Sequence, residues 1–392
     1  MTTEELTYSL TLAHVPEIGV SKYKALTSRF GNAKNVFDQP LSVLAEVNGI
    51  SETTAQRILD AKEDLDVAAA QILVSEQMGI DIVMCNDEKY PSKLNLRRND
   101  APKFIYTKGE CDLETRKILA VVGTRKASPL YKEICDTIIT ELAQKHPDLV
   151  IISGLAEGID ISAHTSAINN GLTTIAVLPL PLNKIYPTKN VSIANEIPQN
   201  GMIISEFEFY SSERKENFVT RNRIIAALSD ALLVVESKED GGSMRTADYA
   251  IECDVPVGAV VGGFGKDNSQ GCNKLIKEGK ASLVSRTQDV ERLLGYVESK
   301  DYESKRPSKQ TVIPSVEAPK PEIKTVPTHD TSALADDARK VFETIARNGG
   351  SMYLDDLSNE LDMSVNDIID ILFDLELDGY VAQKSGNLYQ IQ

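Results

Sequence analysis

Strands and helices alternate between residues 117 and 284, and this alternation constrains the fold more than any other feature of the chain. Short apolar segments with the character of buried strands are each followed by a turn, and most of them by an amphipathic helical segment. The expected strands cover residues 118–123, 150–154, 173–178, 202–206, 231–236, 257–261 and 282–284, and the expected helices cover residues 131–145, 161–170, 192–200, 222–229, 246–253 and 273–278. This alternation is typical of a mostly parallel, doubly wound α/β sheet. Ligands of such sheets bind at the carboxyl ends of the strands, so the turns there are the first candidates for a site.

The composition narrows the classes of function that remain open. With 392 residues the chain is long enough for two or three domains. A formal net charge of −16 argues against a general basic surface that wraps duplex DNA, although it leaves room for a local basic groove. Five cysteines without a C-x-x-C spacing and four scattered histidines predict reduced thiols and no metal site. Neither a secretory signal nor an apolar run long enough for a bilayer is evident, so we expect a cytoplasmic protein without membrane insertion.

Residues 1–78 have the pattern of a separate helical domain. In two similar segments a glycine turn precedes a serine and an amphipathic helix: His14 to Gly19 followed by Ser21, and Val47 to Ile50 followed by Ser51. This pattern resembles a tandem helix-hairpin-helix, whose glycine turns offer backbone amides to DNA phosphates. A small bundle whose hairpins only pack together explains the same pattern, so both interpretations stay open.

The rest of the chain divides into a sheet domain, a linker and a small C-terminal domain. Residues 79–298 form the predicted sheet domain, to which residues 80–84 and 101–106 add a pair of short strands. Residues 299–333 hold five prolines among many lysines and glutamates, which is typical of a flexible linker. The last domain, residues 334–392, has the order of a winged helix: three helices at 335–347, 353–361 and 365–378, and a hairpin of residues 380–383 and 387–391.

The third helix of this predicted winged helix would enter the major groove if the domain read DNA. It has neither lysine nor arginine and carries five acidic side chains, Asp367, Asp370, Asp374, Glu376 and Asp378. Because phosphates would repel such a helix, we expect a protein contact or a purely structural role for this domain.

Four turns at the predicted carboxyl edge of the sheet carry glycine or hydroxyl residues, three of these turns also carry arginine, and two lysines flank Tyr186-Pro187. Glycine after a strand lets the backbone approach a ligand, free amides at a helix start bind phosphate, and an arginine fork matches phosphate oxygens. His164, one helical turn further on, is expected to be bonded locally within the fold. The candidate binding residues are Gly123, Arg125, Lys126, Ser153, Gly154, Lys184, Lys189, Arg221, Asn222, Arg223, Ser243, Arg245 and Thr246.

Several motifs in this region are shared with a known family. They are Tyr90-Pro91, VGTRKAS, SGLAEGIDISAH, TIAVL with IYPTKN, ISE, RNRIIAALSDALLVVES, GGSMRTA and SQGCNKLIKEGKA, in this order between Tyr90 and Val284. The chain is therefore similar to the DprA family, also called Smf, the DNA-processing proteins of natural transformation. The resemblance implies an extended Rossmann-like domain between an N-terminal helical domain of the helix-hairpin-helix or SAM-like type and a C-terminal winged helix.

The resemblance also implies a function. It predicts a protein that binds and protects incoming single-stranded DNA and loads the recombinase RecA onto it, beside or in place of single-strand binding protein. The candidate residues would then cradle the DNA backbone, with slight base preference, because no aromatic row is evident near these turns. We expect a homodimer through the Rossmann-like domain, with its face near Leu275 and Ile276, and neither a cofactor nor catalytic turnover.

Two other functions remain open. Nucleotide hydrolases of the phosphoribohydrolase type share this broad fold and place a glycine-rich loop before paired glutamates. Here Arg245 stands in place of a loop glycine and only Asp248 follows, which favours binding without chemistry. In a protein-recruiting scaffold, DNA contact would be incidental and the acidic winged helix would carry the function.

Overall fold

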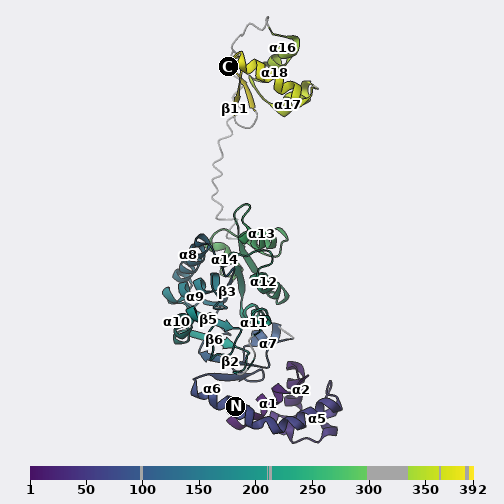
Figure 1. Ribbon diagram of the computed structural model, residues 1–392, viewed down its shortest axis with the longest axis vertical. Coiled ribbons are helices and arrows are strands. Elements are labelled where there is room, and N and C mark those ends of the chain that lie inside the picture. The colour runs from purple at the N-terminus through teal and green to yellow at the C-terminus, as the bar shows by residue number, and fades with distance from the viewer. Residues whose placement is uncertain (98–99, 210, 212–213, 298–333, 362, 385–387) are drawn as a thin grey trace. The chain divides into compact units, whose positions relative to one another are not determined.

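In the part of the chain that the structure describes, nine strands form one sheet in the order β1-β2-β6-β5-β4-β3-β7-β8-β9 (Figure 1). Strands β3 to β9 are parallel, β2 pairs antiparallel with β6, and β1 pairs antiparallel with β2. This confirms the predicted sheet and its extra strand pair. The strands are β1 (Asp81–Met84), β2 (Phe104–Gly109), β3 (Ile118–Val122), β4 (Val150–Ser153), β5 (Thr173–Leu178), β6 (Gly201–Ser205), β7 (Ala231–Val234), β8 (Val257–Val260) and β9 (Ser282–Val284).

The structure is a computed structural model that describes residues 1–392 except 98–99, 210, 212–213, 298–333, 362 and 385–387. The chain divides into two units, Met1–Asp301 and Tyr302–Gln392. The predicted linker, residues 299–333, lies outside the described residues. The predicted boundary between a helical domain and a sheet domain at residue 78 falls inside the first unit, where both segments contribute to one apolar core.

Helices cover both faces of the sheet: α8, α9 and α14 lie on one face, and α11, α12 and α13 lie on the other (Figure 1). Strand β3 shows why both faces are apolar, because its side chains alternate between two cores. Ile118, Ala120 and Val122 belong to one core, whereas Leu119 and Val121 belong to the other. The helices of this part are α7 (Ser92–Arg97), α8 (Pro129–Lys145), α9 (Ile159–Asn169), α10 (Val191–Glu196), α11 (Lys215–Leu228), α12 (Gly242–Glu252), α13 (Gln270–Lys277) and α14 (Thr287–Leu293), with 3-10 turns at Thr188–Asn190, Ile197–Gln199 and Asp267–Ser269.

Helix α11 begins seven residues earlier than the sequence pattern predicts, at Lys215 instead of residue 222. Residues 215–221 contain neither glycine nor proline, so nothing in them interrupts a helix. Helix α12 likewise begins at Gly242 instead of residue 246. The shifts place Arg221 inside α11 and Ser243 in the first turn of α12 instead of in loops, which fixes their directions more tightly.

The N-terminal helices pack on the β1–β2 end of the sheet (Figure 1). Ser51 caps α5 as predicted, because its Oγ accepts the Thr54 amide at 3.1 Å. Ser21 does not cap α2, which begins at Val20 with Gly19 as its N-cap. These helices are α1 (Thr3–His14), α2 (Val20–Phe30), α3 (Ala33–Phe37), α4 (Leu41–Ala45), α5 (Glu52–Asp60) and α6 (Leu65–Gln77), with a 3-10 turn at Ala61–Asp64.

The second unit has its own apolar core, which includes Phe342, Leu357, Leu372 and Tyr389. Its three predicted helices are present, and the predicted hairpin forms a three-stranded sheet with one further strand, β10, that the sequence pattern did not reveal. This arrangement matches the predicted winged helix. The elements are α16 (Asp336–Arg347), β10 (Ser351–Tyr353), α17 (Leu354–Leu361), α18 (Val365–Leu377), β11 (Val381–Lys384) and β12 (Leu388–Ile391).

All five cysteines are free thiols, four of them buried. Within the described parts of the chain, no helix combines the length and the apolar character that crossing a bilayer requires. The same described residues contain no group of three or more His, Cys, Asp or Glu side chains suited to a metal ion.

Gly158 allows the turn after β4 to pass close to the turn after β3. Its φ of +80° and ψ of −122° are disfavoured for other residues, and a Cβ there would overlap the Thr124 carbonyl oxygen. We expect Gly158→Ala to lower the free energy of unfolding of the first unit, measured by urea denaturation, more than Gly171→Ala does. Gly171 also has a positive φ but nothing within 4 Å of its Cβ position, so the overlap should make the loss at Gly158 larger by about 1–3 kcal/mol. Equal losses would show that the two turns do not approach each other this closely.

Candidate nucleic-acid interface

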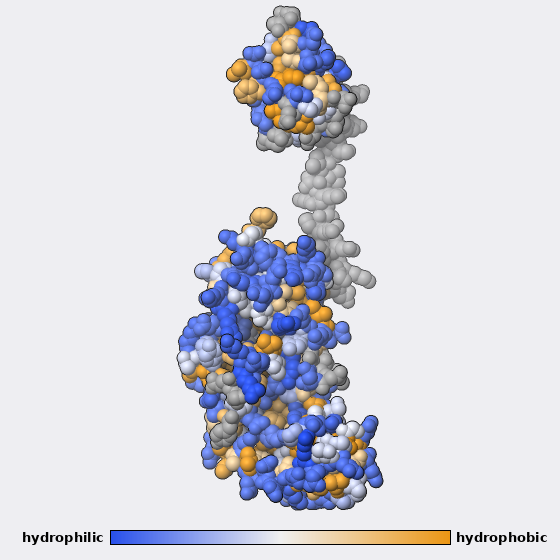
Figure 2. Space-filling view, turned by 45° about the vertical axis from the view of Figure 1, so that its right-hand side comes forward, coloured by the Kyte–Doolittle hydropathy of each residue, from blue (hydrophilic) through white to orange (hydrophobic). Residues whose placement is uncertain are grey.

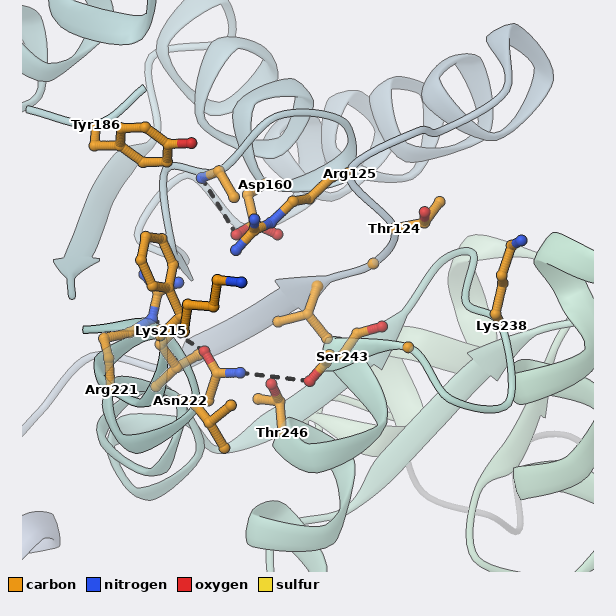
Figure 3. A pocket seen from close by; sticks show the side chains of 18 of the residues that line it. Thr124, Arg125, Asp160, Tyr186, Lys215, Arg221, Asn222, Lys238, Ser243 and Thr246 are labelled. Carbon is orange, nitrogen blue, oxygen red and sulfur yellow. Dashed lines mark hydrogen bonds between the residues drawn. The ribbon is translucent and has the colours of Figure 1, made fainter. Parts of the chain in front are cut away.

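A cavity of about 660 Å³ opens at the carboxyl ends of β3 and β7 (Figure 3). These neighbouring strands mark the point where the chain order reverses, because β4 lies on one side of β3 and β7 on the other. Doubly wound sheets bind their ligands at such a switch point. The lining comes from the turn after β3, the start of α9, the first half of α11, the turn after β7 and the start of α12.

Among the described residues, four exposed cations from three segments line this cavity, and one of them is Arg214, directly before α11. Arg125 follows β3, Lys215 opens α11 and Lys238 follows β7 (Figure 3). Among the described residues of the lining, Asp160 is the single carboxylate. A concave surface with several cations and one carboxylate attracts an anion such as a phosphate.

Helix α12 presents its first turn to the cavity. Gly241, Gly242, Ser243 and Thr246 line the wall, and the unpaired amides of a helix start carry partial positive charge. The hydroxyl of Ser243 is buried and donates to Ser237 Oγ at 2.8 Å, and Thr246 is also buried. Backbone amides, more than these hydroxyls, are therefore the groups of this helix that a ligand would meet.

Two aromatic rings form another wall. The Tyr186 and Phe218 rings meet edge to face with centroids 5.8 Å apart, and Arg125 Cζ lies 5.0 Å from the Phe218 centroid. Tyr186 is 52% exposed. The same three residues also line a second cavity of about 220 Å³, to which Lys126 and Gly154 contribute. The prediction that no aromatic row lies near these turns overlooks this pair of rings, and unpaired bases stack on such rings.

Arg221 is buried in the wall of the main cavity. Its Nη1 donates to the Gly154 carbonyl oxygen at 2.7 Å and to the Val177 carbonyl oxygen, and its Nε donates to Asn222 Oδ1 at 3.0 Å. The guanidinium occupies the space that a side chain at residue 154 would need, which explains the glycine there. Burial lowers the pKa of Arg221 to about 10, so the group stays charged near neutral pH. This placement corrects the prediction that Arg221 binds a phosphate, because its donors form hydrogen bonds within the protein.

Asp160 lies close to this guanidinium. Burial raises the pKa of the Asp160 carboxyl, while the charges of Arg221 and Arg125 and the Ala156 amide act in the opposite direction. A carboxylate in this position offsets the buried charge of Arg221. Asp160 therefore supports the wall of the cavity, and the exposed cations remain available to a ligand.

The structure moves two further predicted residues away from the ligand. Ser153 is fully buried, and its Oγ donates to the Val121 carbonyl oxygen at 2.6 Å. Arg223 forms a two-pronged ion pair with Glu206, at 3.0 and 2.7 Å, and both side chains are largely buried. Both predictions of direct contact are corrected for one reason: these polar groups satisfy partners inside the protein.

Three other predicted cations lie outside the lining of both cavities. Lys189 Nζ lies 2.7 Å from Glu157 Oε1, and Arg245 lies 3.7 Å from Asp248 on the outer side of α12. Lys184 is exposed, near the aromatic wall in sequence. Gly123, Arg125, Arg221, Asn222, Ser243 and Thr246 are the predicted residues that line the main cavity.

Sequence reasoning missed Lys215, Phe218, Tyr186, Lys238 and Arg214. The sequence does indicate Lys215 and Phe218, because Lys215, Phe218 and Asn222 are spaced three and four residues apart along one helix. Once α11 begins at Lys215, this spacing places all three on the cavity face. Lys238 lies in a loop, where no periodicity indicates its direction.

Two residues outside the cavity have partners within the fold. His164 is buried, and its Nδ1 lies 2.7 Å from Thr174 Oγ1, which confirms the predicted local bonding. Burial lowers the pKa of this imidazole to about 3, so it is neutral near pH 7. In the N-terminal helices, Glu17 accepts Arg57 Nη1 at 2.7 Å and Thr54 Oγ1 at 3.2 Å. A carboxylate thus faces the start of α5, which favours packing of the hairpins over phosphate contact.

A doubly wound sheet with a cationic, aromatic-walled cavity at its switch point defines a Rossmann-like binding protein for a phosphate-bearing ligand. The family model of DNA recombination-mediator protein A matches residues 81–295, and that of the DprA winged helix domain matches residues 325–387. The chain belongs to the DNA recombination-mediator protein A family, as its motifs predict. DNA processing protein DprA of Streptococcus pneumoniae is 38% identical over 204 residues, which cover 52% of this chain and 71% of that protein.

Solved structures agree with this assignment. The X-ray structure of DprA from Streptococcus pneumoniae is 30% identical, covers 73% of this chain and 97% of its own, and has a TM-score of 0.62. DNA processing protein A from Helicobacter pylori, described for its single-stranded DNA binding mode, is 32% identical and covers 56% of this chain and 97% of its own, with a TM-score of 0.50.

The structural role of Arg223 predicts a stability effect. Arg223→Ala leaves the Glu206 carboxylate buried without its cation, so we expect it to lower the free energy of unfolding by about 3–5 kcal/mol. The double substitution Glu206→Leu with Arg223→Leu removes both charges and is expected to recover most of that loss in urea denaturation. If the Arg223→Ala variant is as stable as the wild type but binds DNA more weakly, the direct contact that the sequence predicts is supported instead.

Proposed function

We propose that this protein binds single-stranded DNA along the carboxyl edge of its central sheet, without cutting it. The observation that carries the proposal is the pairing of exposed Arg125, Lys215 and Lys238 with the Tyr186–Phe218 wall in one cavity. Cations neutralise the phosphates, and aromatic rings stack with unpaired bases. Family membership supports the same ligand, since the Helicobacter pylori relative is described as binding single-stranded DNA.

The aromatic wall favours a single strand over a duplex. In a duplex the base faces are stacked on their neighbours, so a ring set inside a cavity cannot reach them. The two cavities share Arg125, Tyr186 and Phe218, so this trio can contact nucleotides in either space. The chain's net charge of −16 does not prevent such local binding, because the cations that line the cavity act at short range.

Binding without chemistry fits the acidic residues better than hydrolysis does. Among the described residues of the main cavity, Asp160 is the single carboxylate, and it lies beside buried Arg221. Asp248, the other candidate, lies outside that lining and pairs with Arg245 at 3.7 Å. Glycoside-bond cleavage of the phosphoribohydrolase type uses two carboxylates at the reacting sugar.

Within recombination and natural transformation, the bound strand would be protected and passed to the recombinase RecA, beside or in place of single-strand binding protein. Family membership supports these roles. We further propose a homodimer through the Rossmann-like domain. Leu275 is buried within α13, so a dimer face near it would rest on neighbouring side chains such as the half-buried Ile276.

Removing a cavity cation is expected to weaken binding of a labelled poly-dT oligomer. Arg125→Ala and Lys215→Ala should each cost about 1–3 kcal/mol, measured by fluorescence anisotropy, because each loses a charged hydrogen bond to phosphate. The slope of log affinity against log salt should fall by about 0.7 per lost phosphate contact. Arg245→Ala is the matched control, since Arg245 is 70% exposed but lies outside the cavity lining. Wild-type affinity in both cavity variants would refute this site.

The aromatic wall predicts an effect of a different kind. Phe218→Ala should weaken poly-dT binding by about 1–3 kcal/mol while the salt slope stays unchanged, because stacking is lost and no charge is removed. Phe218→Tyr keeps a ring and should retain most of the affinity. A Phe218→Ala variant that changes only the salt slope would contradict a stacking role.

A further inference from the structure

Helix α18 of the C-terminal unit exposes a row of apolar side chains. Val365, Ile369, Phe373 and Leu377 recur every four residues and are 40%, 41%, 65% and 77% exposed. Residues four apart lie along one side of a helix, so the four form a continuous stripe. In Figure 2 orange apolar side chains reach the surface of this unit.

The stripe is distinct from the face that holds the domain together. Ile368, Leu372 and Leu375 of the same helix are buried in the core of the unit. A helix whose apolar residues are needed only for its own core exposes polar residues on its other faces. Phe373 and Leu377 therefore add nothing to the core, and their exposure needs another explanation.

A row of carboxylates runs beside the stripe. Asp370, Asp374 and Asp378 repeat the four-residue spacing one position further along the helix, and all three are exposed. Asp367 and Glu376 add to the negative charge, and residues 365–378 contain no lysine or arginine. The surface thus combines an apolar stripe with an acidic edge.

This combination selects the chemistry of the partner. Nucleic acid is excluded because phosphates repel the carboxylates. A second copy of the helix is unfavourable, since a two-fold pairing through the stripe would bring two acidic edges close together. An apolar groove rimmed by lysine and arginine side chains fits both rows at once.

We propose that the exposed face of α18, formed by the apolar stripe and the acidic row, docks into an apolar, basic-rimmed groove of another protein. The winged helix is then a protein-recruiting module, separate from the cavity that holds the single strand. Docking buries Phe373 and Leu377, and the carboxylates orient the helix in the groove.

The test replaces Phe373 of the full chain with the photo-crosslinking amino acid p-benzoylphenylalanine. The crosslinking is done in the cells that express this chain. A protein crosslinked there is identified by mass spectrometry and purified, and its affinity for the uncrosslinked chain is measured by calorimetry. We expect Phe373→Ser with Leu377→Ser to weaken binding at least tenfold. Asp370→Asn with Asp374→Asn should weaken it severalfold and reduce its salt dependence, because charge is removed and the stripe kept.

Leu73→Ser is the matched control, because Leu73 is 56% exposed on α6, in the other unit. It should leave the affinity unchanged. The circular dichroism spectrum of the Phe373→Ser, Leu377→Ser variant should match that of the wild type, because both substituted residues are exposed. The proposal would be overturned by crosslinks to DNA, by crosslinks only to a second copy of the chain, or by no crosslink at all. Wild-type affinity in the Phe373→Ser, Leu377→Ser variant would also overturn it.

Discussion

The buried guanidinium of Arg221 joins parts of the sheet edge that are far apart in the sequence. From α11 it donates to the Gly154 carbonyl after β4 and to the Val177 carbonyl in β5, and Asp160 in α9 offsets its charge. A buried cation is stable only when its donors and its charge are satisfied, so these contacts fix one relative placement of the four segments. The main cavity takes its shape from that placement. Arg125 and Lys215 keep their side chains in the cavity because the segments that carry them are held there.

Burial divides the cations of this edge into two groups with different tasks. Arg221 and Arg223 bind partners inside the protein, and Arg221 forms part of the wall of the main cavity. Arg125, Lys215 and Lys238 are exposed around the cavity, where a phosphate can displace their hydration water. The acidic residues follow a similar division, since Asp160 supports the fold whereas the row on α18 faces solvent. A chain with a net charge of −16 can therefore present one cationic cavity and a separate acidic docking face.

Much of this architecture can be read from the sequence, because burial on both sides gives the strands continuous apolar segments and gives the helices their period. The sequence also indicates which strand ends line the main cavity. The sequence does not show that Arg223 is buried whereas Arg125 is exposed, since both are arginines next to glycine- or asparagine-bearing turns. The position of Glu206, which pairs with Arg223, decides which of them is buried. The aromatic wall escapes prediction for a related reason: Tyr186 and Phe218 are 32 positions apart and meet only in the folded sheet. The stripe of α18, in contrast, is local and visible as a four-residue repeat.

The central claim is that a polynucleotide lies against the Arg125–Phe218–Tyr186 trio at the switch point of the sheet. Photo-crosslinking of an oligo-dT that carries 4-thiothymidine tests it most directly, with the attachment sites located by mass spectrometry. Crosslinks concentrated in the peptides that contain Tyr186 and Phe218, and lost under competition by unlabelled single strand, are the predicted result. Crosslinks confined to the N-terminal helical hairpins or to the winged helix, with none at the carboxyl edge of the sheet, would contradict the account.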